Sequence, residues 1–197
     1  MPKSYRTDLL GLEALALERG GYFRREDAHS HGITDRLLSY HTNTGRFERV
    51  LPAVFRIARA PISRWDEFFL AWVWSRYRGA ISHESALSLF GLSDLLPTRI
   101  QVTVPPDESR RSSRFAIYRS QLNDDEITFY EGVRVTTPAR SIADAAAAGA
   151  DPEQIQKAVK EGIQRGLFVP DMLRKATQRK SRNKRMLRRL LDSALQQ

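Results

Sequence analysis

Hydroxyl, phenol and guanidinium side chains are concentrated between residues 24 and 56 of the chain. Side chains of these types contact nucleic acid, because hydroxyl and guanidinium groups read base edges and arginines also bind phosphates. One group of candidates comprises Thr34, Arg36, Ser39, Tyr40 and Thr44. Arginines flank this group on both sides, namely Arg24, Arg25, Arg46, Arg49 and Arg56. The chemistry these residues could perform is therefore recognition of double-stranded DNA.

Local signals predict the elements that would carry these side chains. Leucines at helical spacing predict a helix over residues 5–19, which Gly20-Gly21 ends. A short segment, residues 22–31, follows it. Apolar residues at near-alternating positions around Pro52 predict a β-hairpin over residues 47–57. The helix between these last two segments is the one that would enter the major groove.

This recognition helix is predicted over residues 35–44. Thr34 is the expected N-cap, while Leu37, Leu38 and His41 follow at the spacing of an inward face. The order of helix, short helix, turn, helix and hairpin is typical of a winged helix-turn-helix domain. Many winged-helix domains bind proteins instead of DNA, so a protein-interaction module is the alternative that this pattern leaves open.

The composition changes at Pro61, and we expect a domain boundary there, with one domain over residues 1–60 and a second over residues 61–197. The aromatic residues of 65–77 recur at helical spacing and predict a core helix. Strands are expected over residues 99–104, 114–119, 127–130 and 133–135, with helices over 82–90, 142–148, 155–163, from Pro170, and 186–195. The predicted fold class is α+β: a winged helix-turn-helix domain, then a mixed α/β domain with a small antiparallel sheet and terminal helices.

The net charge of +9, from 32 basic and 23 acidic residues in 197, is unevenly distributed. Residues 1–60 carry +3, residues 61–150 carry −1 and residues 151–197 carry +7. A basic block of this kind indicates an anionic partner. The tail forms a second candidate patch with Lys180, Lys184, and the arginines Arg182, Arg185, Arg188 and Arg189. Four interpretations remain open for it: a second DNA contact, an RNA-binding tail, a tail that docks an acidic protein, or a solvated helix.

No motif indicates catalysis. The chain has no cysteine and four histidines, and His83-Glu84 lacks the second histidine of a zinc helix, so we expect neither metal nor cofactor. Asp124-Asp125-Glu126 is interpreted as a solvated turn between strands. Phosphate-binding glycine loops and the GxSxG elbow are missing as well. We expect a non-enzymatic, cytoplasmic protein, since no apolar run approaches the length of about 20 residues that spans a membrane.

Three stretches of sequence together resemble the AbiEi family of bacterial antitoxins and transcriptional regulators. They are GYFRREDA with GI and GRFERVLPAVFR in residues 21–56, AISHESAL with IQVTVP in residues 80–105, and GVRVTTPARSIAD in residues 132–144. The resemblance covers most of residues 5–170, and the motifs follow the order found in the family. This chain has Ala53 where the family usually has glycine, and Ser141 where the family commonly has threonine.

The resemblance implies a two-domain regulator. Its winged helix would bind inverted repeats in its own promoter, with two copies on the palindromic site, and would repress the operon. Its C-terminal domain would counteract a nucleotidyltransferase toxin, directly or through the toxin's target. The alternatives are a module that neutralises the toxin by direct binding and an RNA-binding protein that uses the basic tail.

Overall fold

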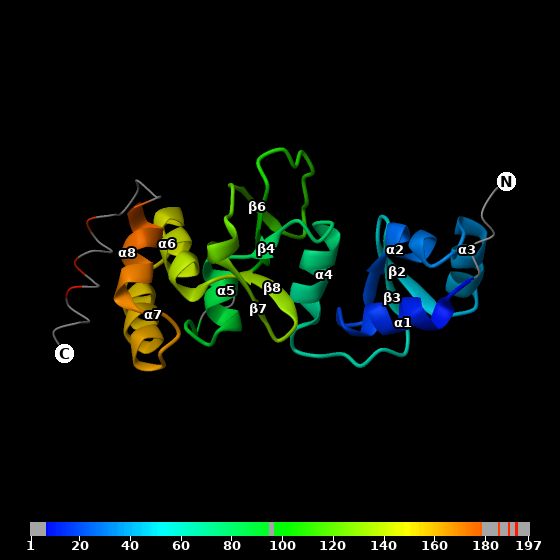
Figure 1. Ribbon diagram of the computed structural model, residues 1–197, viewed down its shortest axis with the longest axis horizontal. Coiled ribbons are helices and arrows are strands. Elements are labelled where there is room, and N and C mark those ends of the chain that lie inside the picture. Colours follow the sequence, from blue (N-terminus) through cyan, green and yellow to red (C-terminus); the bar gives the residue numbers. More distant parts are fainter. Residues whose placement is uncertain (1–6, 95–96, 179–184, 186–188, 190–191, 193–197) are drawn as a thin grey trace. The chain divides into compact units, whose positions relative to one another are not determined.

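The computed structural model describes residues 7–94 and 97–178, together with residues 185, 189 and 192. The chain divides into two compact units (Figure 1). The first unit comprises residues 1–77 and 131–133, and the second comprises residues 78–130 and 134–197. The first unit extends past the boundary expected at residue 60, because the aromatic helix after Pro61 packs against its first strand.

Four helices and a three-stranded sheet make up the described part of the first unit. They are α1 (Leu9–Leu17), β1 (Tyr22–Arg24), α2 (Arg25–Ser30), α3 (Asp35–Asn43), β2 (Phe47–Leu51), β3 (Val54–Ile57) and α4 (Asp66–Trp74). The sheet order is β1-β3-β2, with both pairings antiparallel. The hairpin and the three nine-residue helices α1, α3 and α4 correspond to predicted elements. Strand β1 was not predicted, because a run of three residues becomes a strand only through its pairing with β3.

The core of this unit is aromatic. The Phe23 ring lies edge-on to Phe47 at 4.9 Å between centroids and stacks on Phe55 at 5.7 Å. Leu12 of α1 and Leu38 of α3 are buried in the same cluster. Each of the three strands contributes one phenylalanine, so this cluster fixes both helices against the sheet.

The turn between β2 and β3 contains Pro52 and Ala53. Ala53 has a φ of +59°, in the left-handed region that L-residues with a Cβ atom disfavour. Its carbonyl accepts a hydrogen bond from the Arg25 amide at 3.0 Å, which holds the turn against α2. The hairpin therefore keeps a tight turn without the glycine that the family usually has, and it retains backbone strain at this residue.

Replacing Ala53 with glycine should stabilise the first unit by about 0.5–1 kcal/mol, because glycine adopts a positive φ without steric cost. Urea unfolding followed by tryptophan fluorescence measures this, since Trp65, Trp72 and Trp74 all lie in the first unit. The control is Ala14→Gly at an exposed position of α1, which should destabilise the unit by about 1 kcal/mol. A destabilising Ala53→Gly would contradict the strain assigned to the turn.

The second unit contains a five-stranded sheet of order β6-β5-β4-β8-β7, and its helices lie beside this sheet (Figure 1). Its elements are β4 (Ala80–Ile81), α5 (His83–Leu89), β5 (Gln101–Val104), β6 (Ala116–Arg119), the 3-10 helix η1 (Asp124–Glu126), β7 (Ile127–Tyr130), β8 (Val133–Thr136), α6 (Pro138–Ala148), α7 (Pro152–Gln164) and α8 (Pro170–Gln178). The small sheet was expected to be antiparallel, whereas β4–β8 and β5–β6 pair in parallel. The α+β fold class is confirmed.

A buried ionic cluster joins α6 to η1. The Arg140 guanidinium lies 2.6 Å from a Glu126 carboxylate oxygen and 2.9 Å from an Asp144 oxygen, and all three residues are buried. Burial lowers the pKa of Arg140, but the two carboxylates outweigh it and raise the pKa overall. The interpretation of residues 124–126 as a solvated turn is therefore wrong for Glu126, which is buried because it is the partner of Arg140.

Replacing Arg140 with alanine should destabilise the second unit by about 3–5 kcal/mol, because two buried carboxylates lose their counter-charge. Circular dichroism during urea unfolding measures the loss, while tryptophan fluorescence reports on the first unit. Arg111, which is exposed, provides the matched control, and Arg111→Ala should change stability by less than about 0.5 kcal/mol. Equal stabilities of the two variants would contradict the assigned role of the cluster.

Candidate nucleic-acid interface

The exposed face of α3 carries most of the predicted DNA-binding side chains. Thr34 is the N-cap, as predicted, and its hydroxyl accepts a hydrogen bond from the Leu37 amide at 3.4 Å. Leu38 is buried and Leu37 packs partly against the core, so Arg36, Ser39 and Tyr40 point to solvent. The Tyr40 side chain is 60% exposed. A rigid helix therefore presents a guanidinium, a hydroxyl and a phenol on one surface.

A groove of about 240 Å³ runs beside α3 and brings together residues from the four elements α2, α3, β2 and β3. Arg25 of α2 and Arg49 of β2 line it together with Ser39 and Asn43 of α3. The two arginines are exposed, as phosphate contacts require. Sequence reasoning missed Asn43, although its spacing of four residues from Ser39 places both on one helical face. Amide side chains of this type read adenine in the major groove.

Asp35 places a negative charge at this groove. Its carboxylate lies 3.5 Å from Nε of Arg25 and 3.0 Å from Nε2 of His29, and so links α2 to α3. The carboxylate is exposed, with 63% of its side chain accessible. It orients Arg25, and its negative charge would repel a phosphate that approached the groove.

Replacing Asp35 with asparagine should strengthen binding to non-specific DNA and steepen its salt dependence by up to about one unit of slope, because Arg25 becomes free to contact a phosphate. Fluorescence anisotropy with a scrambled duplex at several salt concentrations measures both quantities. Asp151→Asn is the matched control, since Asp151 also begins a helix but lies in the second unit. Unchanged affinity of the Asp35 variant would show that this carboxylate does not face the DNA.

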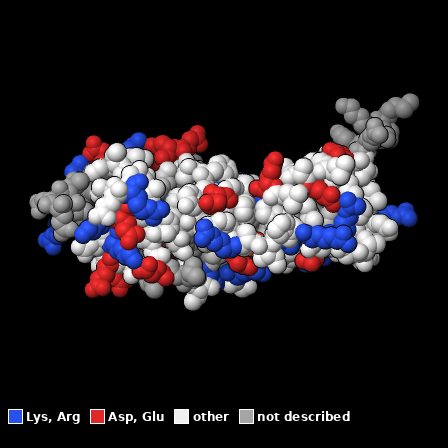
Figure 2. All heavy atoms as spheres, turned by 90° about the horizontal axis from the view of Figure 1, so that it is seen from below, with Lys and Arg blue, Asp and Glu red and all other residues white. Residues whose placement is uncertain are grey.

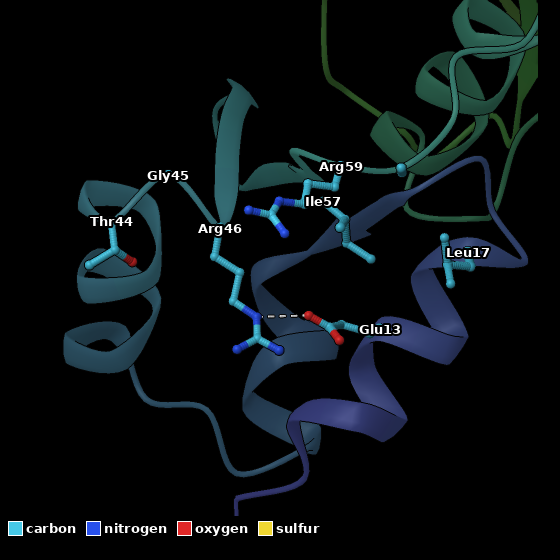
Figure 3. A pocket seen from close by; sticks show the side chains of 8 residues that line it. Glu13, Leu17, Thr44, Gly45, Arg46, Ile57 and Arg59 are labelled. Atoms are coloured by element: carbon cyan, nitrogen blue, oxygen red, sulfur yellow. Dashed lines mark hydrogen bonds and ion pairs between the residues drawn. The ribbon is translucent and has the colours of Figure 1, made fainter.

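Arg46 lies in a second pocket, of about 600 Å³, on another part of the same unit (Figure 3). Its Nε donates to the Glu13 carboxylate at 2.8 Å, and this hydrogen bond raises the pKa of Arg46. Thr44 lines the same pocket, and its hydroxyl donates to the Tyr40 carbonyl at 3.0 Å. Burial and the nearby Arg46 charge lower the pKa of His41. Arg46 and Thr44 thus lie away from the groove that holds Ser39 and Arg49.

Arg59, which sequence reasoning did not select, also lines this second pocket. It is exposed, and it forms no ion pair within the described part of the chain. The signal that could have identified it is its place two residues after β3, where the chain leaves the sheet. The pocket therefore holds one arginine bound to Glu13 and a second arginine available to a partner.

Two arginines predicted to bind DNA are buried inside the first unit. Arg24 is 3% exposed, and its guanidinium donates to the Val73 and Trp74 carbonyls at the end of α4. Arg56 is 6% exposed and donates to the Ala60 carbonyl at 2.8 Å. Both guanidinium groups bind backbone carbonyls within residues 60–74 and are not exposed to a partner. We therefore remove Arg24 and Arg56 from the predicted DNA-binding surface.

The basic tail is described only in part. Lys180, Arg182, Lys184 and Arg188 lie outside the described residues, as does most of the helix expected over residues 186–195. Arg185 and Arg189 have helical backbone and exposed side chains. Over the face shown in Figure 2, acidic and basic side chains are interspersed, and charge alone does not mark an interface there. We therefore define the candidate interface by the exposed face of α3 and its flanking arginines.

None of the described helices is long and apolar enough to cross a membrane. Among the described residues, no three histidine, aspartate or glutamate side chains are grouped so that they could hold a metal ion.

The first unit is a helix-turn-helix-like domain, with α2 and α3 as the helix pair and the β2–β3 hairpin beside them. Residues 12–58 match the family described as "Transcriptional regulator, AbiEi antitoxin", so the resemblance is confirmed over this part of the chain. No curated protein sequence matches the chain. In a solved structure of the RV2827C protein from Mycobacterium tuberculosis, the similarity covers 98% of this chain and 80% of that one, with 15% identity and a TM-score of 0.63. This similarity shows a shared fold.

Proposed function

We propose that the protein is an antitoxin and transcriptional regulator that binds inverted repeats in its own promoter and represses its operon. The observation that carries the proposal is the exposed row of Arg36, Ser39 and Tyr40 on α3, flanked by Arg25 and Arg49. The match of residues 12–58 to a family of regulators supports it. The protein acts in the cytoplasm, where its operator lies, as a non-enzymatic factor without cofactor or metal.

The mechanism follows from helix-turn-helix geometry. Helix α3 enters the major groove, where Arg36 reads a guanine edge, and Ser39 and Tyr40 contact neighbouring bases or phosphates. Arg25 and Arg49 bind phosphates on either side and fix the orientation of the helix. One domain of this size covers one half-site, so an inverted repeat binds two copies. Repression follows where the two copies occlude the promoter.

Substituting Arg36 and Arg49 separately tests the assigned roles. Arg36→Ala should cost about 1–3 kcal/mol of binding free energy and relax specificity at one base pair. Arg49→Ala should weaken binding to all sequences and reduce the salt slope by about one unit. Fluorescence anisotropy on the upstream region measures both effects, and Arg111→Ala controls for the loss of one positive charge. Wild-type affinity and salt slope in both variants would refute this surface.

The antitoxin role requires a second activity, which we assign to the second unit. We propose that it counteracts a nucleotidyltransferase toxin, by contact or through the toxin's target. Co-expression of this protein with the toxin encoded beside its gene should restore growth of the host cells. The Arg36→Ala variant should still protect the cells from the toxin but should no longer repress the operon. If protection and repression are lost together, the two activities do not belong to separate units.

A further inference from the structure

The pocket that contains Arg46 and Arg59 has a cationic side and an apolar side (Figure 3). Its volume of about 600 Å³ lies within the range of about 300–1,000 Å³ that is typical of small-molecule sites. Residues of α1, of the turn between α3 and β2, and of the chain at the end of β3 line it. All of them belong to the first unit. One compact unit therefore forms this concave site by itself.

Two arginines and one glutamate form the cationic side. Nε of Arg46 donates to the Glu13 carboxylate at 2.8 Å, so these two residues make a neutral pair that holds the Arg46 guanidinium in place. The Arg59 guanidinium points toward Arg46, and no ion pair of Arg59 is found among the described residues. Two positive charges against one negative charge leave the pocket with one positive charge in excess. Two guanidinium groups of like charge that face one pocket are stabilised when an anion lies between them.

The apolar side consists of Leu17, Ile57 and Ala60. Ile57 and Ala60 are buried, whereas Leu17 is 54% exposed and leaves an apolar surface open beside the two arginines. A ligand that covered this leucine would gain the free energy of removing apolar surface from water. A flat ring would in addition stack on the plane of a guanidinium group.

We propose that this pocket binds a small organic monocarboxylate, with its carboxylate between Arg59 and Arg46 and an apolar ring against Leu17. A carboxylate matches the planar fork of a guanidinium group and accepts two parallel hydrogen bonds from it. The backbone of a DNA duplex carries no such ring and would leave Leu17 exposed. Thr44 is the C-cap of α3 and also lines the pocket, so the bound acid would lie beside the end of the recognition helix.

The charge of the pocket selects a monoanion. One negative charge balances the excess positive charge of Arg46, Arg59 and Glu13. A phosphate monoester carries about two negative charges at neutral pH, and its second charge would be repelled by the Glu13 carboxylate. A neutral molecule of the same shape would leave the Arg59 charge without a counter-ion in the pocket.

Titration of benzoate into the full-length protein, followed by backbone amide NMR shifts, tests the site. The amides of Leu17, Gly45 and Arg59 should shift together with one dissociation constant. Those of Ser39 and Arg49, in the groove beside α3, should not shift. Acetate has the charge without the ring, and benzyl alcohol has the ring without the charge. Each should bind at least about tenfold more weakly than benzoate.

Substitutions of exposed side chains separate the two sides of the pocket. Arg59→Gln should weaken benzoate binding by about tenfold, because the carboxylate loses a charged donor. Arg64→Gln removes the same charge at another exposed position of the first unit and should keep the affinity within about twofold. Leu17→Gln should weaken binding of benzoate but not of acetate. Its control is Leu10→Gln, at an exposed leucine of α1 that does not line the pocket.

Glu13→Gln tests the charge balance. The glutamine keeps an oxygen that can accept from Nε of Arg46, but it removes the negative charge, so the pocket gains a second uncompensated positive charge. Phenyl phosphate, a dianion, should bind the wild-type protein more weakly than benzoate does. This preference should reverse in the Glu13→Gln variant.

Four results would overturn the inference. Benzoate could give no saturable shift at the pocket amides, or Arg59→Gln and Arg64→Gln could bind it equally well. Shifts confined to the groove beside α3 would show that benzoate imitates a DNA phosphate. Tighter binding of phenyl phosphate than of benzoate to the wild-type protein would refute the monocarboxylate class. None of these measurements uses DNA, so their outcome is independent of the proposed function.

Discussion

The packing of Phe23 against Phe47 and Phe55 is the interaction on which the first unit depends. Each ring comes from a different strand, so burying the three together forms the sheet β1-β3-β2. The same cluster receives Leu12 from α1 and Leu38 from α3. The orientation of α3 relative to the β2–β3 hairpin is therefore set by the core. Outward side chains such as Arg36 and Ser39 can then vary for recognition without disturbing the core, because they take no part in this packing.

The position of each arginine decides what it can do. Arg24 and Arg56 are paired with backbone carbonyls of the chain between β3 and the end of α4, where burial makes these hydrogen bonds strong and keeps solvent out. Arg25 and Arg49 remain accessible at the groove beside α3. Arg46 is held by Glu13, and Arg59 faces the same pocket. Three kinds of environment thus separate six arginines that lie close together in the sequence.

The sequence by itself determined the elements that depend on neighbouring residues. Thr34 capped α3 as predicted, Leu37 and Leu38 defined its inner face, and the hairpin formed around Pro52, because helix caps, helical periodicity and tight turns are local properties. Those signals were sufficient for the α+β class and for the exposed candidates on α3.

Only the tertiary structure decided what depends on partners distant in sequence. β1 exists through pairing with β3. The parallel pairings of the second sheet join β4 to β8 across several intervening elements and β5 to β6 across a loop. Burial of Arg24 and Arg56 follows from packing of the chain that continues into α4, and burial of Glu126 follows from Arg140. A charged residue has the same local signal whether it is solvated or buried with a partner, so its location is settled only when distant segments meet.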